Sequence, residues 1–431
     1  MTQENDMPPR KKRSTKSTSQ IRRLEALINA SKILNSTLDL DELLKIILEL
    51  ATKNLKAARG TIYLIDEEKN ELWSKVLKGK ELVRIRLPIG TGIAGHVAKT
   101  GKTVNLRHAW KDKRFFSGFD LRTGFQTKTM LCMPMRDRKG KIIGVFQILN
   151  KKVGVFDKQD EYFLEAFSDH AALAIENARL HLAIVEKERI EKEIEIAGTI
   201  QRRLLPKEIP SLPGYELDAI AQPTKMVGGD YFDIIKLDDG KFALVVADVS
   251  GKGVPAALLV STLHASLHAY IEGTLDLAEL NGKLNHVVYA NTEPERFITL
   301  FIGILDIPQA TFTYVNAGHN FPFVFRPSTS SLSTLASGGL PLGMFEVTQF
   351  QQETISLSKQ DTIVLYTDGV TEAMDKSFRE YGEDRLRKRI IENGEKPAAV
   401  LKQDIVSDVA RFVADEPQSD DLTLMVVKRV S

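Results

Sequence analysis

Aspartate stands at the end of several strand-like apolar segments. Asp248 ends the run LVVAD, Asp368 ends IVLYTD, and Asp420 and Asp421 directly precede LTLMVV. Asp230 follows two glycines in VGGDYFD. Carboxylates at such strand ends are costly to hold near one another unless a cation offsets their repulsion. Hard oxygen ligands of this kind suit Mg²⁺ or Mn²⁺, so the pattern predicts a divalent-metal centre.

Each of these aspartates also has a purely structural interpretation. Asp248, together with Ser250, could cap a helix that starts near Val254. Asp368 and Gly369 form a common turn dipeptide. Because spacing along the chain does not show which strand ends meet in space, both interpretations remain open at this point.

The composition is that of a globular protein of two or three domains. Hydrophobic residues make up 43% and charged residues 27% of the 431 residues, close to globular averages. The single cysteine, Cys132, excludes an intrachain disulfide and favours a reducing compartment. No apolar run reaches the roughly 18 residues of a membrane helix, and the polar N-terminus lacks the apolar stretch of a signal peptide. We therefore expect a cytoplasmic protein without a membrane contact.

The chain opens with a basic segment. Residues 1–23 hold seven Lys and Arg residues against two acids, with no apolar anchor in PPRKKRSTKSTSQ. This composition predicts a solvated, disordered tail over residues 1–19, and a contact with nucleic acid or an acidic membrane is the alternative. The rest of the chain has a slight acidic excess, which gives no support to a nucleic-acid-binding domain.

The elements that must position the acids fall into two groups with a connector. A helix capped by Asp39 precedes strand-like runs at 60–66, 83–88 and 141–150, which predicts an α/β sensor-type domain with an antiparallel sheet. Residues 173–204 follow a 3-4 apolar spacing typical of a coiled-coil helix, although a helix packed on its own domain would show a similar pattern. Beyond the prolines that end it, strand-like runs mix with helical stretches at 254–272, 276–291 and 397–413.

Six motifs follow one another along the C-terminal half: VGGDYFD (227–233), VADVSGKGVPAALL (246–259), NAGHNFP (316–322), GLPLG (339–343), YTDGVTEA (366–373) and SDDLTLMVV (419–427). In this order they resemble the PPM-type, metal-dependent serine/threonine phosphatases, and most closely their SpoIIE-like bacterial branch. The resemblance implies an αββα sandwich over 206–431 that dephosphorylates a phosphoprotein. For this branch the implied substrate is a STAS-type anti-sigma factor antagonist.

The same resemblance implies a role for each aspartate. Asp248 would bridge two divalent ions, Mn²⁺ or Mg²⁺, and the carbonyl of Val249 would bind one of them. Asp230 would support the cluster, and Asp368 and Asp420 would bind the ions from the far side. These aspartates would act through a metal-bound water that attacks phosphorus in line.

Three further positions have weaker implied roles, and one expected group is missing. Asp233 and Asp421 are candidates for supporting the ligands, and His319 reads better as a packed loop histidine than as a general acid. Eukaryotic relatives carry an arginine before the first aspartate, where QPTKMVGGD offers only Lys225. The SpoIIE-like branch also lacks it, so the group that binds the substrate phosphate stays unassigned.

The N-terminal half carries a second resemblance. LDLDELLKIILELA (38–51), GTGIAGHVAKTGKTVNL (90–106) and KGKIIGVFQILNK (139–151) resemble a GAF domain over 20–180. A spaced pattern also fits the N-K…F-x₃-D-E signature of cyclic-nucleotide-binding GAF domains, which implies cAMP or cGMP: Asn150, Lys151, Phe156, Asp160 and Glu161. Another small ligand, or none, is the alternative, because a Lys151–Asp160 ion pair could simply fasten the last strand to the final helix.

These observations predict an α/β (α+β) protein with a GAF sensor (20–180), a coiled-coil connector (181–205) and a phosphatase domain (206–431), assembled as a homodimer. The leading hypothesis is a signal-regulated, metal-dependent protein serine/threonine phosphatase. The alternative is a catalytically weak scaffold in which the GAF domain binds cyclic nucleotide, and the intact set of four acids argues against it. A cyclic-nucleotide phosphodiesterase would need histidine-rich metal motifs, and the eight histidines do not form them.

Overall fold

The computed structural model describes residues 25–431 except 26, 31, 35, 79–80, 239, 273–275 and 294, with no description of the side chains of 75–84, 119, 122 and 123. The basic tail predicted over 1–19 and the start of the first predicted helix near Ile21 lie outside the described residues. The chain divides into two compact units, 1–188 and 189–431, and each is described by itself.

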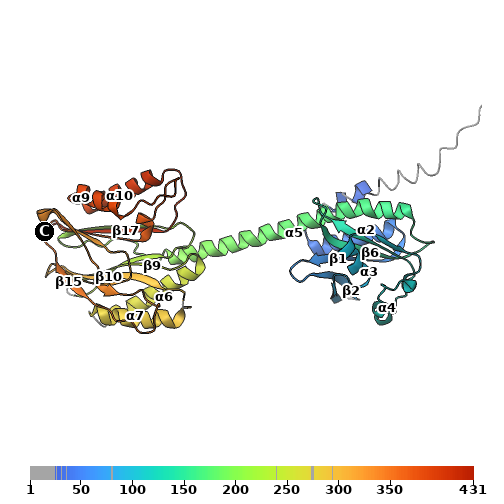
Figure 1. Ribbon diagram of the computed structural model, residues 1–431, viewed down its shortest axis with the longest axis horizontal. Coiled ribbons are helices and arrows are strands. Elements are labelled where there is room, and N and C mark those ends of the chain that lie inside the picture. The colour runs from blue at the N-terminus through green and yellow to red at the C-terminus, as the bar shows by residue number, and fades with distance from the viewer. Residues whose placement is uncertain are drawn as a thin grey trace, which may run out of the picture. The chain divides into compact units, whose positions relative to one another are not determined.

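The N-terminal unit is built on one antiparallel sheet with helices on both faces (Figure 1). Its strand order is β3-β2-β1-β6-β5-β4. The strands are β1 (Ala57–Asp66), β2 (Glu71–Lys78), β3 (Glu81–Pro88), β4 (Val104–Leu106), β5 (Met130–Arg136) and β6 (Ile142–Lys151). The helices are α2 (Leu40–Asn54), α3 (Gly92–Thr100), α4 (Gly118–Thr123), the 3₁₀ turn η1 (Ala109–Lys111) and α5 (Lys158–Gln201).

Alternation along the strands gives this sheet two apolar faces. Ile62 and Phe146 point toward α2 and the first turns of α5, where Phe167 is fully buried. Tyr63 and Val145 point the other way, toward α3. At the start of α2, Asp39 caps the helix and accepts a hydrogen bond from the Glu42 amide at 2.8 Å, as the sequence predicts.

Helix α5 is longer than the predicted connector. It begins at Lys158, before the helical pattern predicted over 173–204 and the connector predicted over 181–205, because its first turns pack their apolar side into the core of the N-terminal unit. The division between the two units falls within it, between residues 188 and 189. Its middle and last turns expose several large apolar side chains: Leu180, Leu182, Ile184, Val185, Ile190, Ile196 and Ile200.

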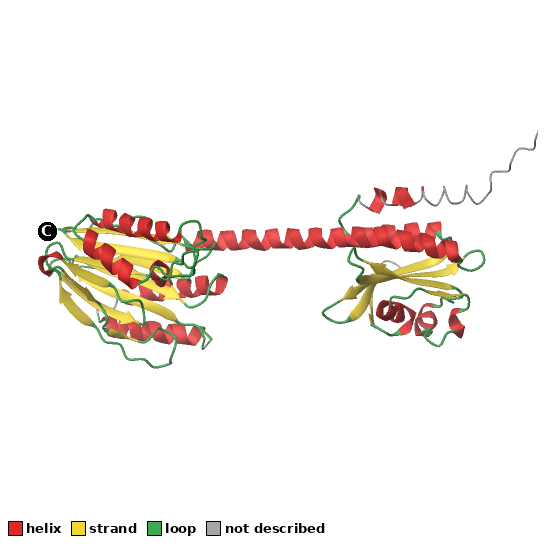
Figure 2. Cartoon of the chain, turned by 45° about the horizontal axis from the view of Figure 1, so that its top comes forward, coloured by secondary structure: helices red, strands yellow, loops and turns green. Residues whose placement is uncertain are grey.

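The C-terminal unit is a four-layer αββα sandwich, as the phosphatase resemblance implies (Figures 1 and 2). One sheet has the order β14-β11-β10-β9-β8 with β15 beside β11, and the other has the order β13-β12-β16-β17-β7. The strands of the first sheet are β8 (Asp230–Lys236), β9 (Lys241–Val249), β10 (Ile298–Asp306), β11 (Thr311–Ala317), β14 (Gly338–Gly339) and β15 (Glu353–Ser356). Those of the second are β7 (Tyr215–Gln222), β12 (Phe323–Arg326), β13 (Ser331–Thr334), β16 (Thr362–Tyr366) and β17 (Leu422–Arg429).

Three apolar layers hold this sandwich together. Side chains such as Phe301 and Met425 fill the space between the sheets. Helices α6 (Val254–Ile271) and α7 (Leu277–Asn291) cover the outer face of the first sheet. The second sheet is covered by α9 (Glu383–Asn393) and α10 (Ala398–Val413), and the short elements are α8 (Asp368–Thr371) and η2 (Pro327–Thr329).

Within the described part of the chain, α6 is long and apolar enough, by length and composition alone, to cross a membrane. Its Leu263 and Leu267 are instead fully buried in the cluster that joins it to the first sheet. Burial of such a face against a sheet is what a core helix requires. Its apolar composition is therefore accounted for by packing within the sandwich.

Candidate active site

The four predicted aspartates gather where one end of each sheet meets the other. In the first sheet, β8 and β9 are antiparallel neighbours and place Asp230 directly opposite Asp248. In the second, β16 and β17 are antiparallel neighbours, so the residues just after β16 and just before β17 lie at the same end: Asp368 and Asp420. The hydroxyl of Thr367 crosses between the sheets and donates a hydrogen bond to Asp230 Oδ2 at 2.7 Å.

Burial and the repulsion between neighbouring carboxylates raise the pKa of three aspartates in the cluster. Burial, then the charges of Asp368 and Asp420, raise the pKa of Asp248 to about 7. Burial and the charge of Asp248 hold the pKa of Asp230 well above its usual range. Burial and the charge of Asp420 also raise the pKa of Asp368. The folded chain therefore keeps these acids together at an electrostatic cost that a bound cation would remove.

Lys252 counters this charge, and the sequence analysis assigned it no role. Its Nζ lies 2.8 Å from Asp420 Oδ2 and donates to the Ser419 carbonyl at 3.0 Å. Its positive charge lowers the pKa of both Asp248 and Asp368, against the effect of the neighbouring acids. The signal was present in the sequence, because Lys252 stands between two glycines in the motif VADVSGKGVPAALL.

Glu372 is a second residue that the sequence analysis passed over. Burial raises its pKa, and the charges of Asp368, Glu380 and Asp420 raise it further. It lies at the end of α8, the short helix that begins with Asp368. Glu372 therefore adds to the negative potential on the side of the cluster formed by the second sheet.

Asp421 accepts hydrogen bonds from the segment before β8, whereas its neighbour Asp420 pairs with Lys252. Its Oδ1 accepts from the amide and the hydroxyl of Thr224 at 2.6 and 2.8 Å, and its Oδ2 accepts from the Gly229 amide at 2.8 Å. These bonds fix the segment that leads into β8 and occupy both carboxylate oxygens. Asp420 is left at the rim of the cluster, with 35% of its side chain exposed. This arrangement agrees with choosing Asp420 over Asp421 as the ligand.

The donor set fits hard divalent cations. Carboxylate and carbonyl oxygens are the ligands that Mg²⁺ and Mn²⁺ prefer, and the cluster offers several with raised pKa. Glycine keeps the space beside them open: a Cβ at Gly229 would lie 3.0 Å from the Val249 carbonyl oxygen and 3.3 Å from Asp248 Oδ1. The backbone at Gly369 is just as confined, since a Cβ there would collide with the Asp421 carbonyl oxygen. Glycine at these two positions therefore allows the backbone to approach the acid cluster closely.

His319 is buried below the cluster, with 3% of its surface exposed. Its Nε2 lies 3.1 Å from the Tyr366 carbonyl and its Nδ1 lies 2.9 Å from the Thr299 hydroxyl. The carbonyl requires a proton on Nε2, so Nδ1 accepts from the threonine. Burial lowers the pKa of this histidine to about 4. A neutral, fully bonded imidazole suits the packing interpretation better than a general-acid role.

The five residues of the N-terminal signature join the end of β6 to the start of α5 and to neighbouring loops, and we call this arrangement the latch. Lys151, at the end of β6, pairs with the buried Asp160 at the start of α5. Asn150 has a positive φ of 54° and spans two segments: it accepts from the Lys128 amide at 2.6 Å and donates to the Gln126 carbonyl at 2.7 Å. Phe156 is buried, and Glu161 accepts from Asn105 at 2.8 Å. This is the ion-pair arrangement that the alternative interpretation describes.

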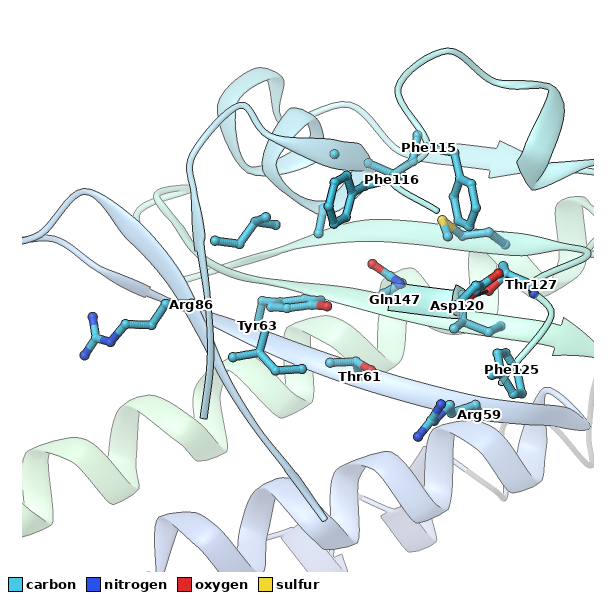
Figure 3. A pocket seen from close by; sticks show the side chains of 17 residues that line it. Arg59, Thr61, Tyr63, Arg86, Phe115, Phe116, Asp120, Phe125, Thr127 and Gln147 are labelled. Atoms are coloured by element: carbon cyan, nitrogen blue, oxygen red, sulfur yellow. Dashed lines mark hydrogen bonds between the residues drawn. The ribbon is translucent and has the colours of Figure 1, made fainter. Parts of the chain in front are cut away.

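A pocket opens on the α3 face of the same sheet, and none of the five signature residues lines it. In Figure 3, Tyr63 and Gln147 project from the sheet toward Phe116, while Arg59 lies beside Phe125. The Arg59 guanidinium is 5.1 Å from the centre of the Phe125 ring. Asn150 hydrogen-bonds to the backbone of residues 126–129, and Thr127 in this segment lines the pocket. The signature therefore supports one wall of the pocket without lining it.

Comparison with known proteins identifies both units. The family described as Stage II sporulation protein E (SpoIIE) matches residues 238–430, and the GAF domain family matches residues 39–175. Phosphoserine phosphatase RsbU of Bacillus subtilis (strain 168) is 32% identical over 244 residues, which cover 56% of this chain and 72% of RsbU. The "Probable 3',5'-cyclic phosphodiesterase pde-5" of Caenorhabditis elegans is 34% identical over 172 residues, which cover 37% of this chain and 24% of that protein.

Among solved structures, the SiaA-PP2C domain of Pseudomonas aeruginosa matches with a TM-score of 0.51 and 20% identity. The match covers 56% of this chain and 98% of that domain, and it supports the fold of the sandwich. Together with the ordered motifs and the acid cluster, these matches agree with both resemblances drawn from the sequence. The chain belongs to the SpoIIE-type, PP2C-like phosphatases, as an RsbU-like member with a GAF domain ahead of its phosphatase domain.

Proposed function

We propose that this chain hydrolyses phosphoserine or phosphothreonine in a protein substrate and depends on two divalent ions, Mn²⁺ or Mg²⁺. The single observation that carries this proposal is the convergence of four partly buried aspartates at the ends of the two sheets, with the pKa of Asp230, Asp248 and Asp368 raised. The groups that would hold the ions are Asp230, Asp248, the Val249 carbonyl, Asp368 and Asp420. When bound, such ions activate water and neutralise charge on the phosphoryl oxygens.

The surrounding residues hold these ligands in place. Thr367 orients Asp230 through its hydroxyl and at the same time accepts from the Thr423 amide at 2.9 Å, which ties the orienting group to β17. Asp421 fixes the glycine segment that precedes Asp230. Fixed ligand orientations of this kind lower the reorganisation needed at each turnover. The chain's contribution is therefore a rigid, oriented set of oxygen ligands.

Lys252 is our candidate for binding the substrate phosphate. Its side chain is 45% exposed and its ammonium already binds a carboxylate oxygen of Asp420. A phosphate monoester dianion presents the same kind of acceptor, and a charge-assisted hydrogen bond to it is stronger than a neutral one. Lys252 would thus serve where eukaryotic relatives use an arginine.

The proposed protein substrate is a STAS-type anti-sigma factor antagonist. Support comes from the likeness to RsbU, which is named a phosphoserine phosphatase. The test is phosphate release from a serine-phosphorylated STAS protein with Mn²⁺, Mg²⁺ or EDTA. We expect release with metal and none with EDTA. If a generic phosphoester is hydrolysed while the STAS phosphoprotein is not, the substrate assignment is wrong and the enzyme assignment stands. Absence of turnover on either substrate with any metal would favour the scaffold hypothesis.

We further propose that the N-terminal pocket binds a small regulatory ligand, with cAMP or cGMP as the first candidates. The aromatic rings of Tyr63 and Phe125 and the Arg59 cation suit a planar, anionic ligand. Calorimetric titration with cAMP, cGMP and AMP would test this. We expect Arg59→Gln to weaken binding. Arg138→Gln is the control, because that exposed arginine does not line the pocket. No binding of either cyclic nucleotide would remove them as ligands.

The same proposal includes regulation through α5 in a homodimer. The exposed apolar side chains on its later turns would be covered by a second copy of the helix. Inserting two residues near Lys187 should leave basal turnover intact and abolish its response to ligand, because the insertion rotates the helix register. An unchanged ligand response in the insertion variant, or a monomer in light scattering, would contradict this scheme.

A cytoplasmic location fits the one cysteine, whose thiol is buried.

A further inference from the structure

A second group of metal-binding side chains lies outside the acid cluster. His264 and His268 are four residues apart on α6 and share one face of the helix. Asp233 faces them from β8, with its Oδ2 2.7 Å from His268 Nε2 and 3.8 Å from His264 Nδ1. The three ligand atoms all lie within 4.8 Å of one another. None of the three is a proposed ligand of the phosphatase centre, and Asp233, which the sequence analysis considered as a support for those ligands, instead contacts Tyr231, His264 and His268.

This group lies on the opposite face of β8 from Asp230. Side chains alternate along β8, so Asp230 faces the second sheet while Tyr231 and Asp233 face α6. Tyr231 packs among the helix-covered core residues, and its hydroxyl donates to Asp233 Oδ2 at 2.6 Å. The group is therefore separated from the acid cluster by the sheet, and its ligands are imidazole and carboxylate instead of carboxylate alone.

The separations of the ligand atoms lie near those of a tetrahedral zinc site, and all three atoms lie within 4.8 Å of one another. Zinc bonds of about 2.0–2.1 Å place neighbouring tetrahedral ligand atoms roughly 3.3 Å apart. The observed separations of 2.7 and 3.8 Å lie on either side of this value, and the two imidazole rings are already close, with 4.4 Å between their centres. Side-chain torsions alone can supply shifts of this size. Two imidazoles and one carboxylate leave the fourth position for water.

The position of the group also gives an ion access to it. β8 is the edge strand of its sheet, and 43% of the His268 side chain is exposed while Asp233 is buried. The Tyr231 hydroxyl, 2.9 Å from His264 Nδ1, can keep its bond to Asp233 when that nitrogen binds an ion.

We propose that Asp233, His264 and His268 form a Zn²⁺ site that ties α6 to the edge strand β8. Imidazole nitrogen suits Zn²⁺, whereas the all-oxygen acid cluster suits Mg²⁺ and Mn²⁺, so the two centres select different ions. Bound zinc would join the helix layer to the strand that begins with Asp230. Its expected role is to stabilise this corner of the sandwich, and the proposal does not depend on the phosphatase activity.

The test uses Co²⁺ as a coloured substitute for Zn²⁺. The full-length protein is stripped of metal, supplied with excess Mg²⁺ to fill oxygen sites, and titrated with Co²⁺. Tetrahedral cobalt with nitrogen ligands absorbs strongly in the visible, and octahedral cobalt bound by oxygen absorbs weakly. We expect a strong band that one equivalent of Zn²⁺ abolishes. His268→Gln and His264→Gln should each weaken binding by at least about 10–100-fold, the loss seen even for groups that only support a metal ligand.

The matched control is His286→Gln, which removes an exposed histidine from α7 and should leave the cobalt band unchanged. The melting temperature of each metal-free variant verifies that it folds. Zn²⁺ should raise this temperature in the parent and the control, and not in the two test variants. A parent protein without the band, or a band that persists in both His264→Gln and His268→Gln, would overturn the proposal whether or not the phosphatase assignment holds.

Discussion

The signature acids of the N-terminal unit and the acid cluster of the C-terminal unit have opposite charge balances. In the N-terminal unit, Lys151 pairs with Asp160, and the Arg114 guanidinium lowers the pKa of Asp112 to about 2. In the C-terminal unit, burial and neighbouring carboxylates raise the pKa of Asp248 to about 7. Paired charges join one segment of the chain to another, whereas an excess of partly buried carboxylates with raised pKa is typical of a functional site.

This difference separates two motifs that look equally functional in the sequence. Asp160 belongs to the pattern that resembles the signature of cyclic-nucleotide-binding GAF domains, yet its carboxylate already pairs with Lys151 and accepts a hydrogen bond from the Asp157 amide at 2.9 Å. Asp420 belongs to the motif for which the resemblance implies metal binding, and it lies at the rim of its cluster with the half-exposed Lys252 as a counter-charge. The predictions below test whether this contrast in charge balance corresponds to a contrast in function.

The largest expected effect follows from removing the central carboxylate. Asp248→Asn should reduce metal-dependent turnover by at least about 10²–10³-fold, the cost of losing one preorganised charged group. The metal-free variant should melt at a higher temperature than the parent, because the neutral amide relieves repulsion. Asp404→Asn is the control, since it removes an exposed carboxylate that pairs with Lys396. Turnover at the parent rate in folded Asp248→Asn would disprove the assigned centre.

The next largest effect concerns the latch in the N-terminal unit. Lys151→Met should lower the free energy of unfolding by about 3 kcal/mol, because it leaves the buried Asp160 carboxylate without its cation. Lys141→Met removes an exposed pair with Glu67 and should cost less than about 1 kcal/mol. Denaturant unfolding measures both. If Lys151→Met loses ligand binding with no loss of stability, the signature contacts the ligand directly and the latch interpretation fails.

Measuring the free energy of unfolding of the metal-free protein over a pH series tests whether repulsion among the clustered carboxylates destabilises the fold. Because the folded pKa of Asp248 is raised from 3.8 to about 7, its contribution to stability is fully present below about pH 3.8 and is lost as the pH rises through about 7. Asp230 and Asp368 act in the same direction. Each unit of pKa shift corresponds to about 1.4 kcal/mol. Saturating Mn²⁺ should remove the decline, and a metal-free stability that rises over this range would contradict the assignment.

The smallest effect concerns substrate binding. Lys252→Gln should raise KM about tenfold, as expected for the loss of one charge-assisted hydrogen bond, with a smaller change in kcat. Inhibition by inorganic phosphate should weaken in parallel. Lys225→Gln is the comparison, because Lys225 is exposed and is the one basic residue of the QPTKMVGGD segment that leads to Asp230. Equal effects of the two substitutions would show that Lys252 has no special contact with phosphate.

Much of this architecture could be predicted from local patterns. The helices expected at 254–272, 276–291 and 397–413 appear as α6, α7 and α10, because apolar periodicity and caps act over short distances. The convergence of Asp230 and Asp248 with Asp368 could not be derived that way, since it depends on how the two sheets face each other. The motif resemblance supplied that information.

Long-range contacts also explain the omissions. Lys252 acquires its role only through Asp420, which lies far along the chain. The spacing of His264 and His268 is visible in the sequence, but their carboxylate partner comes from β8. The start of α5 at Lys158 reflects packing of Phe167 into the N-terminal core, which a search for a coiled-coil seam does not detect.

The most direct test of the central claim is phosphate release from para-nitrophenyl phosphate by the purified full-length protein, with Mn²⁺, with Mg²⁺ and with EDTA. The account predicts turnover with metal that EDTA abolishes and that Asp248→Asn lacks. Turnover that persists in EDTA, or that is equal in parent and Asp248→Asn, would contradict the claim that the carboxylate cluster is a metal-dependent phosphatase centre.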